Sequence, residues 1–292
     1  MKILIIGSNK SKESKLLKEE AEKRNHSVEI IPLSKLILKG QKNLMISTPN
    51  GLDIKNFEAI LFRAISKHII EAKIIAQYMK DKKRIVIDEI LAKGNYEYHK
   101  FFMHSQLWAK NIPQPLTFFA LNLNTIKKAV DELNPPFIVK HIKEMHGQGN
   151  FRFDSQEQLL DFFKNKNHFG KYLIQKWYSS KCYYRTIVLG NKVLGAMERL
   201  SLHCKNRPKI PLNQRSKKAS LSSGLEKISL KATQAIGIEL AGLDIMPDSK
   251  GHLRLLEINR SPQFKRFSQV TGLNIAKEII KYIEGKGINK DL

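Results

Sequence analysis

The stretch AGLDIMPDSKGHLRLLEINRSP, residues 241–262, is the most informative part of the sequence for the fold. Its two apolar runs, Leu243–Met246 and Leu253–Asn259, flank the turn-forming residues Asp248–Gly251. Apolar runs of this length on either side of a turn predict a β-hairpin. We therefore expect two adjacent antiparallel strands in this part of the chain.

The second strand of this hairpin carries polar residues that are candidates for a metal site. Glu257 and Asn259 are two residues apart, so their side chains project from one face of the strand. The apolar Leu256 and Ile258 take the other face. A carboxylate and an amide oxygen side by side are hard ligands that suit Mg²⁺.

Asp244 is an acidic residue inside an otherwise apolar strand, where a charge is costly unless it is paired or bound to a metal. Counting outward from the turn of an ideal hairpin places Asp244 opposite Arg254 rather than Glu257. Two interpretations therefore stay open. Either Asp244, Glu257 and Asn259 hold a metal, or Asp244 pairs with Arg254 and the other two are ordinary polar groups at a strand end.

Residues 1–92 have the pattern of a small parallel α/β domain, in which short apolar runs alternate with helical patterns. The expected elements are strand Lys2–Ile6, helix Ser11–Arg24, strand Ser27–Pro32, strand Ala59–Phe62, helix Ile69–Met79 and strand Arg84–Ile87. The turn after the first strand, Gly7–Lys10, has no second glycine. It therefore lacks the pattern of a Rossmann dinucleotide site.

Two lysines in the middle of the chain are candidates for phosphate contacts. Lys140 ends the apolar run 137–139 and precedes a loop that contains Gly147 and Gly149, and Lys100 lies on an expected helix. Lysine neutralises phosphate as a point charge, and loop glycines let backbone N–H groups approach phosphate oxygens. An ordinary glycine turn is the alternative interpretation.

The chain carries 51 Lys and Arg against 27 Asp and Glu, a formal net charge of +24. This excess predicts attraction to an anion such as nucleotide phosphate, nucleic acid, an acidic peptide or a membrane surface, with a merely soluble surface as the alternative. No recognition helix, zinc finger or aromatic RNA platform is recognisable. Nucleic-acid binding therefore stays a secondary hypothesis.

Cysteine content and hydropathy indicate a cytoplasmic protein with no membrane partner. Cys182 and Cys204 are too few for a disulfide framework or a four-ligand zinc site. The first residues, MKILIIG, lack a cleavage site and predict a strand rather than a signal peptide. No apolar run approaches the roughly 20 residues that cross a bilayer.

Several short motifs follow one another in a specific order along nearly the whole chain. They are Tyr98–Phe101, Phe137–Lys140 with the Gly147/Gly149 loop, Tyr172–Gln175, Tyr184–Gly190, Ala196–Arg199, Ala241–Ile245 and Leu256–Pro262. Each motif is weak alone, but their order and spacing resemble the ATP-grasp ligases, and most of all the RimK-like subgroup.

The resemblance implies an α/β (α+β) protein with the ATP-grasp fold and an N-terminal parallel α/β (pre-ATP-grasp) domain. The expected division is an N-terminal domain over 1–92, a central ATP-grasp subdomain with a glycine lid loop over 93–175, and a C-terminal ATP-grasp subdomain with the metal site over 176–292. Family members often pair through their N-terminal or central parts, so a homo-oligomer is a further expectation.

The resemblance also implies an ATP-dependent carboxylate-amine ligase that uses Mg²⁺, with Mn²⁺ as an alternative. ATP would phosphorylate a carboxylate to an acyl phosphate, and an amine would then displace phosphate to form a C–N bond. The expected substrates are an amino acid, with glutamate as a candidate, and an acidic protein or peptide acceptor. A ligase for a small peptide or metabolite and a non-catalytic protein that binds ATP or nucleic acid are the alternatives.

Carried over by position, the resemblance also assigns site residues. It assigns nucleotide contacts to Lys100, Lys140, Gly147, Gly149, Gln175, Lys176, Trp177 and Tyr178. It assigns the metal to Asp244, Glu257 and Asn259. Arg185 would stabilise charge on the transferring phosphoryl group or the acyl phosphate, and Arg63 matches an N-domain arginine that tends to face the substrate cleft.

This chain departs from the family pattern at two acids. Lys176 stands where the family has a hinge acid, and Tyr183 stands where it has an acid two residues before Arg185. These departures affect adenine binding and the substrate pocket. The metal-binding residues are intact, which favours catalysis over a binding-only protein.

Overall fold

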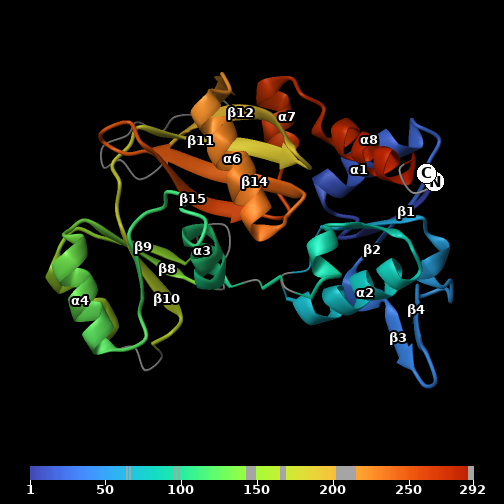
Figure 1. Cartoon of the computed structure of the whole chain (residues 1–292), viewed down its shortest axis with the longest axis horizontal. Helices are drawn as coiled ribbons and strands as arrows, with labels where there is room; N and C mark the ends of the chain where they lie inside the picture. Colours follow the sequence, from blue (N-terminus) through green and yellow to red (C-terminus); the bar gives the residue numbers. More distant parts are fainter. Residues whose placement is uncertain are drawn as a thin grey trace.

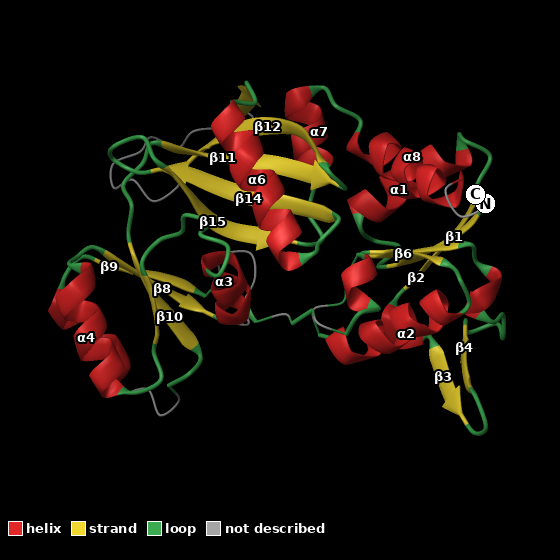
Figure 2. Cartoon of the chain, viewed as in Figure 1, coloured by secondary structure: helices red, strands yellow, loops and turns green. Residues whose placement is uncertain are grey.

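The structure of the chain is a computed structural model that describes residues 1–63, 65, 67–94, 96–97, 99–142, 149–164, 169–201 and 215–288. The described residues form three larger sheets and one separate two-stranded sheet. Figure 1 shows their arrangement along the sequence, and Figure 2 distinguishes helices from strands. No helix in these ranges is both long enough and apolar enough to cross a membrane.

The N-terminal sheet is parallel throughout. Its strands are β1 (Lys2–Ile6), β2 (Ser27–Ile31), β5 (Ala59–Phe62) and β6 (Ile85–Ile87), in the order β2-β1-β5-β6. Ile6 and Phe62 pack on the face covered by α2 (Ile69–Asp81), whereas Ile5 and Leu61 pack on the face covered by α1 (Lys12–Glu22). The sheet confirms the expected parallel α/β N-terminal region.

A short antiparallel hairpin, which the sequence did not predict, extends from this region (Figure 1). It consists of β3 (Ile37–Gly40) and β4 (Leu44–Ser47). Three single-turn 3₁₀ helices, Leu33–Lys35, Ile54–Asn56 and Glu89–Leu91, complete the N-terminal region.

The central sheet is antiparallel and has a core of its own. Its strands are β7 (Thr117–Phe119), β8 (Phe137–His141), β9 (Asn150–Phe153) and β10 (Tyr172–Lys176), in the order β7-β10-β8-β9. Helices α4 (Leu123–Leu133) and α5 (Gln156–Lys164) contribute to this core. On α4 the buried residues recur at Ile126, Ala129, Val130 and Leu133, the spacing of one helix face.

The third sheet is also antiparallel and carries one long helix on one face. Its strands are β11 (Cys182–Leu189), β12 (Lys192–Leu200), β13 (Ser216–Ala219), β14 (Leu240–Pro247) and β15 (Leu253–Asn259), in the order β13-β12-β11-β14-β15. Helix α6 (Ser223–Ile236) crosses this sheet in Figure 2 and packs on it through residues such as Ile228 and Ala232. The helix ends at Gly237, whose φ of +79° is the left-handed conformation that favours glycine.

Three further helices connect these layers. Helix α3 (Lys100–Trp108) packs against α6, and α7 (Lys265–Thr271) packs against β12 and β13. Helix α8 (Ile275–Ile288) lies alongside α1. The end of the described chain thus returns to the N-terminal sheet.

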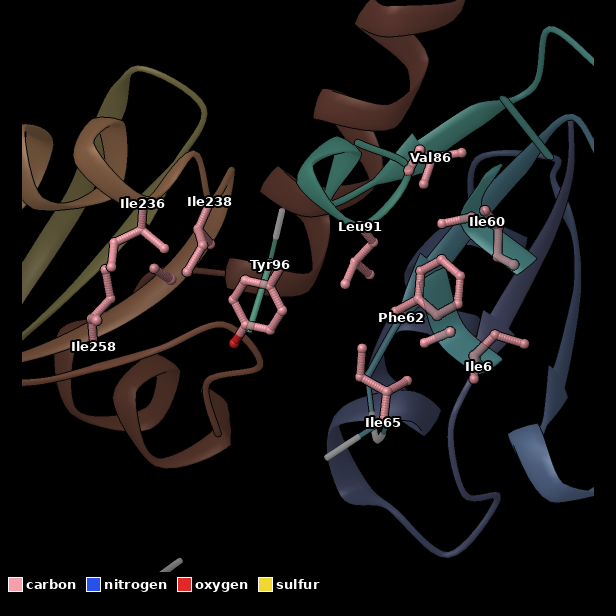
Figure 3. Packing of buried hydrophobic residues seen from close by; sticks show 14 of the residues in the cluster. Ile6, Ile60, Phe62, Ile65, Val86, Leu91, Tyr96, Ile236, Ile238 and Ile258 are labelled. Carbon is pink, nitrogen blue, oxygen red and sulfur yellow. The ribbon is translucent and has the colours of Figure 1, made fainter. Parts of the chain in front are cut away.

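A continuous apolar core joins the N-terminal sheet to the third sheet. Figure 3 shows Ile6 and Phe62 on one side, Ile236 and Ile258 on the other, and Tyr96 between the two groups. All of them are buried. The two sheets are therefore held together by apolar packing.

Candidate active site

The polar residues expected to bind a metal lie together on the third sheet. Asp244 on β14 pairs directly with Glu257 on β15, and Gly242 pairs with Asn259 two positions further along. Directly paired residues share a face, so Asp244, Glu257 and Asn259 project from one face of the hairpin. Glu257 is exposed, and Asn259 is half-buried.

The expectation that Asp244 lies opposite Arg254 is wrong, because the register of the hairpin is shifted. The strands close at Pro247 and Leu253, so the turn is longer than simple counting assumed. A bulge next to Asp244 then adds one residue to β15, and Leu256 is that extra residue. The longer turn and the bulge together bring the two carboxylates to paired positions.

The bulge also changes which leucine packs in the core. We expected Leu256 on the apolar face, but Leu255 is buried in the core and Leu256 is only half-buried. The backbone N–H of Leu255 donates to the carbonyl oxygen of Pro113 at 2.8 Å. The linker before β7 is therefore bound to β15 at the bulge.

Arg185 holds Asp244 in a bidentate ion pair. Its Nε and Nη2 donate to the two carboxylate oxygens at 2.6 Å each. Met197, Arg185, Asp244 and Glu257 form one row of paired positions across β12, β11, β14 and β15. Burial opposes the charged form of Arg185, but Asp244 outweighs it, and the pKa of Arg185 is raised.

The two lysines expected at the phosphates lie near this row. Burial is the largest influence on Lys140 and lowers its pKa to about 8, with Glu257 and Asp244 opposing the shift and Lys100 adding to it. Lys100, at the start of α3, donates to the carbonyl oxygen of His141 at 2.9 Å. The central and third sheets thus bring an ammonium group within electrostatic reach of two carboxylates.

Sequence reasoning missed His104, which lies beside these lysines. Its Nδ1 contacts Oε1 of Gln114, and its ring stacks on Trp108 with centroids 5.5 Å apart. Burial lowers the pKa of His104 to about 4, so the ring is neutral at pH 7. His104 lies four residues after Lys100, a spacing that places both side chains on one face of a helix. This spacing could have identified His104 from the sequence.

The hinge residues after the central sheet make mostly structural contacts. Gln175 is 1% exposed, and its Nε2 donates to a hydroxyl on β7 at 2.8 Å. The Nζ of Lys176 donates to the carbonyl oxygen of Leu133 at 2.7 Å, at the end of α4. Arg152 lies over the ring of Trp177 at 4.9 Å from its centroid. The ammonium that replaces the expected hinge acid is therefore engaged with α4.

Arg254 is not the partner of Asp244, contrary to one of the two interpretations. Its Nη2 donates to Oδ2 of Asp248 at 3.1 Å, and its guanidinium lies over the ring of Tyr178 at 5.9 Å. Asp248 also accepts hydrogen bonds from two backbone N–H groups of the turn. Arg254 thus stabilises the turn rather than the row of charges.

Tyr183, which stands in place of an acid, lies under a second guanidinium. The ring centroid is 5.4 Å from the guanidinium carbon of Arg199. Burial is the main cause that raises the pKa of Tyr183, so its phenol stays neutral at pH 7. A neutral phenol therefore lies two positions before Arg185 on β11, where the resemblance led us to expect an acid.

Arg63 lies at the junction of the N-terminal sheet with the end of β15. It is 8% exposed, its Nη2 donates to the carbonyl oxygen of Pro262 at 2.7 Å, and its guanidinium lies 5.3 Å from the ring centroid of Phe264. Among the described residues its Nε and Nη1 have no hydrogen-bond partner. Burial first, and Arg260 second, lower the pKa of Arg63 to about 10.

The predicted lid falls mostly outside the described residues, and Gly147 is among those left out. Gly149 is described, and its carbonyl oxygen accepts a hydrogen bond from the N–H of His141 at 2.9 Å. The role of this loop therefore stays a prediction.

The donor set of Asp244, Glu257 and Asn259 fits Mg²⁺. It offers two carboxylates and one amide, and Mg²⁺ typically takes few protein oxygens and keeps several waters. Across the described ranges no three His, Cys, Asp or Glu side chains gather as a metal cluster. Both oxygens of Asp244 also accept from Arg185, so Glu257 and Asn259 are the donors that carry the fit to a hard, partly hydrated cation.

Comparison with known proteins agrees with this geometry. Residues 98–283 match the family described as the RimK-like ATP-grasp domain. A curated protein of Legionella pneumophila (strain Corby), "Probable alpha-L-glutamate ligase", is 28% identical over 294 residues, which cover 98% of this chain and 96% of the relative.

Solved structures share the fold over almost the whole chain. The ATP-grasp ligase PsnB, complexed with minimal precursor, Mg, and ADP, is 14% identical with a TM-score of 0.74 and covers 97% of both chains. The macrocyclase MdnC, bound with precursor peptide MdnA from Microcystis aeruginosa MRC, is also 14% identical, with a TM-score of 0.73 over 98% of this chain and 100% of that chain. The chain therefore belongs to the RimK-like ATP-grasp family and is an ATP-dependent carboxylate-amine ligase.

Proposed function

We propose that this ligase uses ATP and Mg²⁺ to join an amino acid, with glutamate as the first candidate, to a carboxylate of an acidic protein or peptide. The name of the Legionella relative supports glutamate, and the peptide complexes of PsnB and MdnC support a peptide acceptor. The observation that carries the proposal is the row Arg185, Asp244 and Glu257 within electrostatic reach of Lys140.

In the first step a carboxylate oxygen of the acceptor attacks the γ-phosphorus of ATP. A new O–P bond forms the acyl phosphate, and the bond to ADP breaks. Both reactants are anionic, so cations must neutralise them and hold them in line. We propose that Lys140 and Lys100 contact the phosphates of ATP and that Arg185 contacts the phosphoryl group during its transfer. Mg²⁺, when bound, would supply further positive charge.

In the second step the amine nitrogen of the added amino acid attacks the acyl carbon. The C–N bond forms, phosphate leaves with the electron pair of the C–O bond, and the nitrogen releases a proton to solvent. We assign the contact with the substrate to Arg63, because two of its nitrogens, Nε and Nη1, have no hydrogen-bond partner among the described residues. A buried guanidinium with unused donors suits a carboxylate ligand.

The remaining assignments follow the same plan. We propose the substrate-side domain over 1–92, the central subdomain with its Gly147–Gly149 lid over 93–175, and the metal-bearing subdomain over 176–292. The adenine would contact the segment Gln175–Tyr178. Because the Lys176 ammonium binds the end of α4, recognition there falls to backbone groups of the segment.

The test is ADP release by the full chain with ATP and Mg²⁺, screened against glutamate, other amino acids and acidic peptides. Glu257→Gln removes a metal ligand from an exposed position, so it should abolish turnover without unfolding the chain. Glu226→Gln, on the helix that covers the opposite face of the same sheet, is the matched control and should keep full activity. Equal activity in both variants would contradict the assignment.

The acceptor panel separates the alternatives. ADP release with small peptides or metabolites but not with acidic proteins would favour a small-molecule ligase. Nucleotide binding without turnover in every mixture would indicate a binding-only protein. Salt-sensitive nucleic-acid binding with no need for ATP would favour the nucleic-acid hypothesis.

A further inference from the structure

A cavity of about 570 Å³ lies away from the active site, between β6 and α8. Its lining includes Lys80, Arg84, Val86, Tyr282 and Gly285. The catalytic row lies on the third sheet, whereas this cavity lies at the β6 edge of the N-terminal sheet. Its volume falls within the range of roughly 300–1,000 Å³ that is typical of small-molecule sites.

The cavity gathers more positive charge than the protein itself neutralises. Four cationic side chains and one acid line it: Lys80, Arg84, Lys281, Lys286 and Glu89. The acid forms an ion pair with Lys80, and Lys286 pairs with Glu239 just beyond the lining. Arg84 and Lys281 therefore carry the charge that remains.

Arg84 is the group that points to a ligand. Its Nε is buried and has no hydrogen-bond partner within the described part of the chain. Leaving a buried donor unpaired costs free energy, so an acceptor group placed next to Arg84 would be favoured. Lys281 is held only weakly, with its Nζ 4.0 Å from Glu278 at an exposed position.

The rest of the wall suits a compact organic molecule. Ile85 and Val86 are only 5% and 4% exposed and supply apolar surface. The Tyr282 hydroxyl donates to Glu239 at 2.8 Å, and burial first, with Glu239, raises the pKa of this phenol, so it stays neutral. At Gly285 an added Cβ would meet no atom within 4 Å.

We propose that this cavity binds a small multivalent oxyanion, with the Arg84 fork on one phosphate or carboxylate group and Lys281 on a second. A guanidinium fork matches the paired oxygens of either group, and a nearby ammonium adds a point charge. The site is separate from the ATP site and does not rest on the acceptor proposed above.

Pyrophosphate and citrate are the probes for this site, measured by calorimetry on the full chain saturated with ADP and Mg²⁺. We expect a binding event that is weakened at least tenfold in Arg84→Gln. Gly285→Glu places a competing carboxylate on the wall and should abolish the event. Lys128→Ala, which removes one cation from exposed α4, is the matched control for net charge and should bind as the wild type does.

Hydrogen exchange locates the event. The ligand should slow exchange in residues 80–86 and 281–286 of the wild type but not of Gly285→Glu. Tighter binding of pyrophosphate would identify a phosphate ligand, and tighter binding of citrate would identify a carboxylate ligand. Equal affinity in wild type, Arg84→Gln and Gly285→Glu, or protection confined to the strand of Lys140, would overturn the proposal.

Discussion

Two bidentate arginine–carboxylate pairs have nearly the same geometry but belong to different parts of the molecule. Arg185 donates to Asp244 at 2.6 Å and 2.6 Å, and Arg24 donates to Glu284 at 2.8 Å and 2.6 Å. The first lies within a row of charged residues on the third sheet. The second ties α8 to the chain just before β2, where His26 also contacts Glu284.

The difference lies in what surrounds each pair. Asp244 is paired with a second carboxylate, that of Glu257, and lies within electrostatic reach of Lys140, the charges that we assign to metal and phosphates. Glu284 accepts from Arg24 and contacts His26, and no other partner is found in the described part of the chain. Equal ion-pair geometry therefore predicts loss of activity in one case and loss of stability in the other.

The largest expected effect is at the first pair. Arg185→Lys keeps the charge but loses the fork that holds both oxygens of Asp244. We expect kcat/KM for ADP release to fall about 100-fold, the loss of a charged contact made in the transition state. Steady-state kinetics check it, and Arg24→Lys should keep at least half of the wild-type value. A similar fall of kcat/KM in both variants would contradict the different roles that we give to the two pairs.

The next effect is a pH dependence of nucleotide binding. The pKa of Lys140 is lowered to about 8, so above that pH the free protein loses the ammonium that we assign to the phosphates. The dissociation constant for ADP should rise about tenfold per pH unit between pH 8.5 and 9.5, since one proton is linked to binding. Calorimetry from pH 7 to 9.5 measures this slope. Lys140→Arg should flatten it, and an unchanged slope in that variant would assign the titration to another group.

The third effect is on stability. The Arg24 hydrogen bonds hold the pKa of Glu284 down to about 2, below its ordinary value of 4.5. The folded state therefore gains stability above pH 4.5 that is lost as the pH falls towards 2. Glu284→Gln should lower the free energy of unfolding by about 2 kcal/mol at pH 7 and by much less near pH 2.

Urea unfolding at several pH values measures this effect. Glu22→Gln removes a solvent-exposed helix pair with Lys18 at 3.6 Å and serves as the control. It should cost less than about 0.5 kcal/mol. If Glu284→Gln lowers the free energy of unfolding as little as the control does, the Arg24–Glu284 ion pair contributes little to folding.

The smallest effect concerns the hinge. Lys176→Ala removes the ammonium that binds the Leu133 carbonyl at the end of α4. The expected cost is about 0.5–1 kcal/mol of stability, with ADP affinity changed less than twofold. Thermal unfolding and calorimetry test the two parts. A large loss of ADP affinity would instead show that the Lys176 ammonium contacts the nucleotide.

Much of the fold could be predicted because it depends on local patterns. Alternating apolar runs and turn residues located the N-terminal parallel strands, and the hairpin of the third sheet was expected from runs such as Leu243–Met246, which the structure extends to Leu240–Pro247. The hairpin β3–β4 was missed. Its strands are four residues each, and most of their apolar side chains are exposed, so burial gives them no clear period.

The register of the hairpin that carries Asp244 and Glu257 could not be predicted, because its bulge depends on a distant contact. The turn is set by Asp248, which accepts from two backbone N–H groups, and the bulge lies where Leu255 binds Pro113. Pro113 lies 142 positions before Leu255, so the sequence around the hairpin gives no sign of this hydrogen bond. The nearness of Lys140 to Asp244 likewise depends on how two sheets with separate cores pack.

The bond from Leu255 to Pro113 has a mechanical consequence. It fixes the chain entering the central sheet to the strand that carries Glu257. The chain leaves that sheet through only five residues, 177–181, before β11 begins. The Lys100–His141 hydrogen bond adds a third attachment, between α3 and β8, so the central sheet is restrained against sliding along the third sheet.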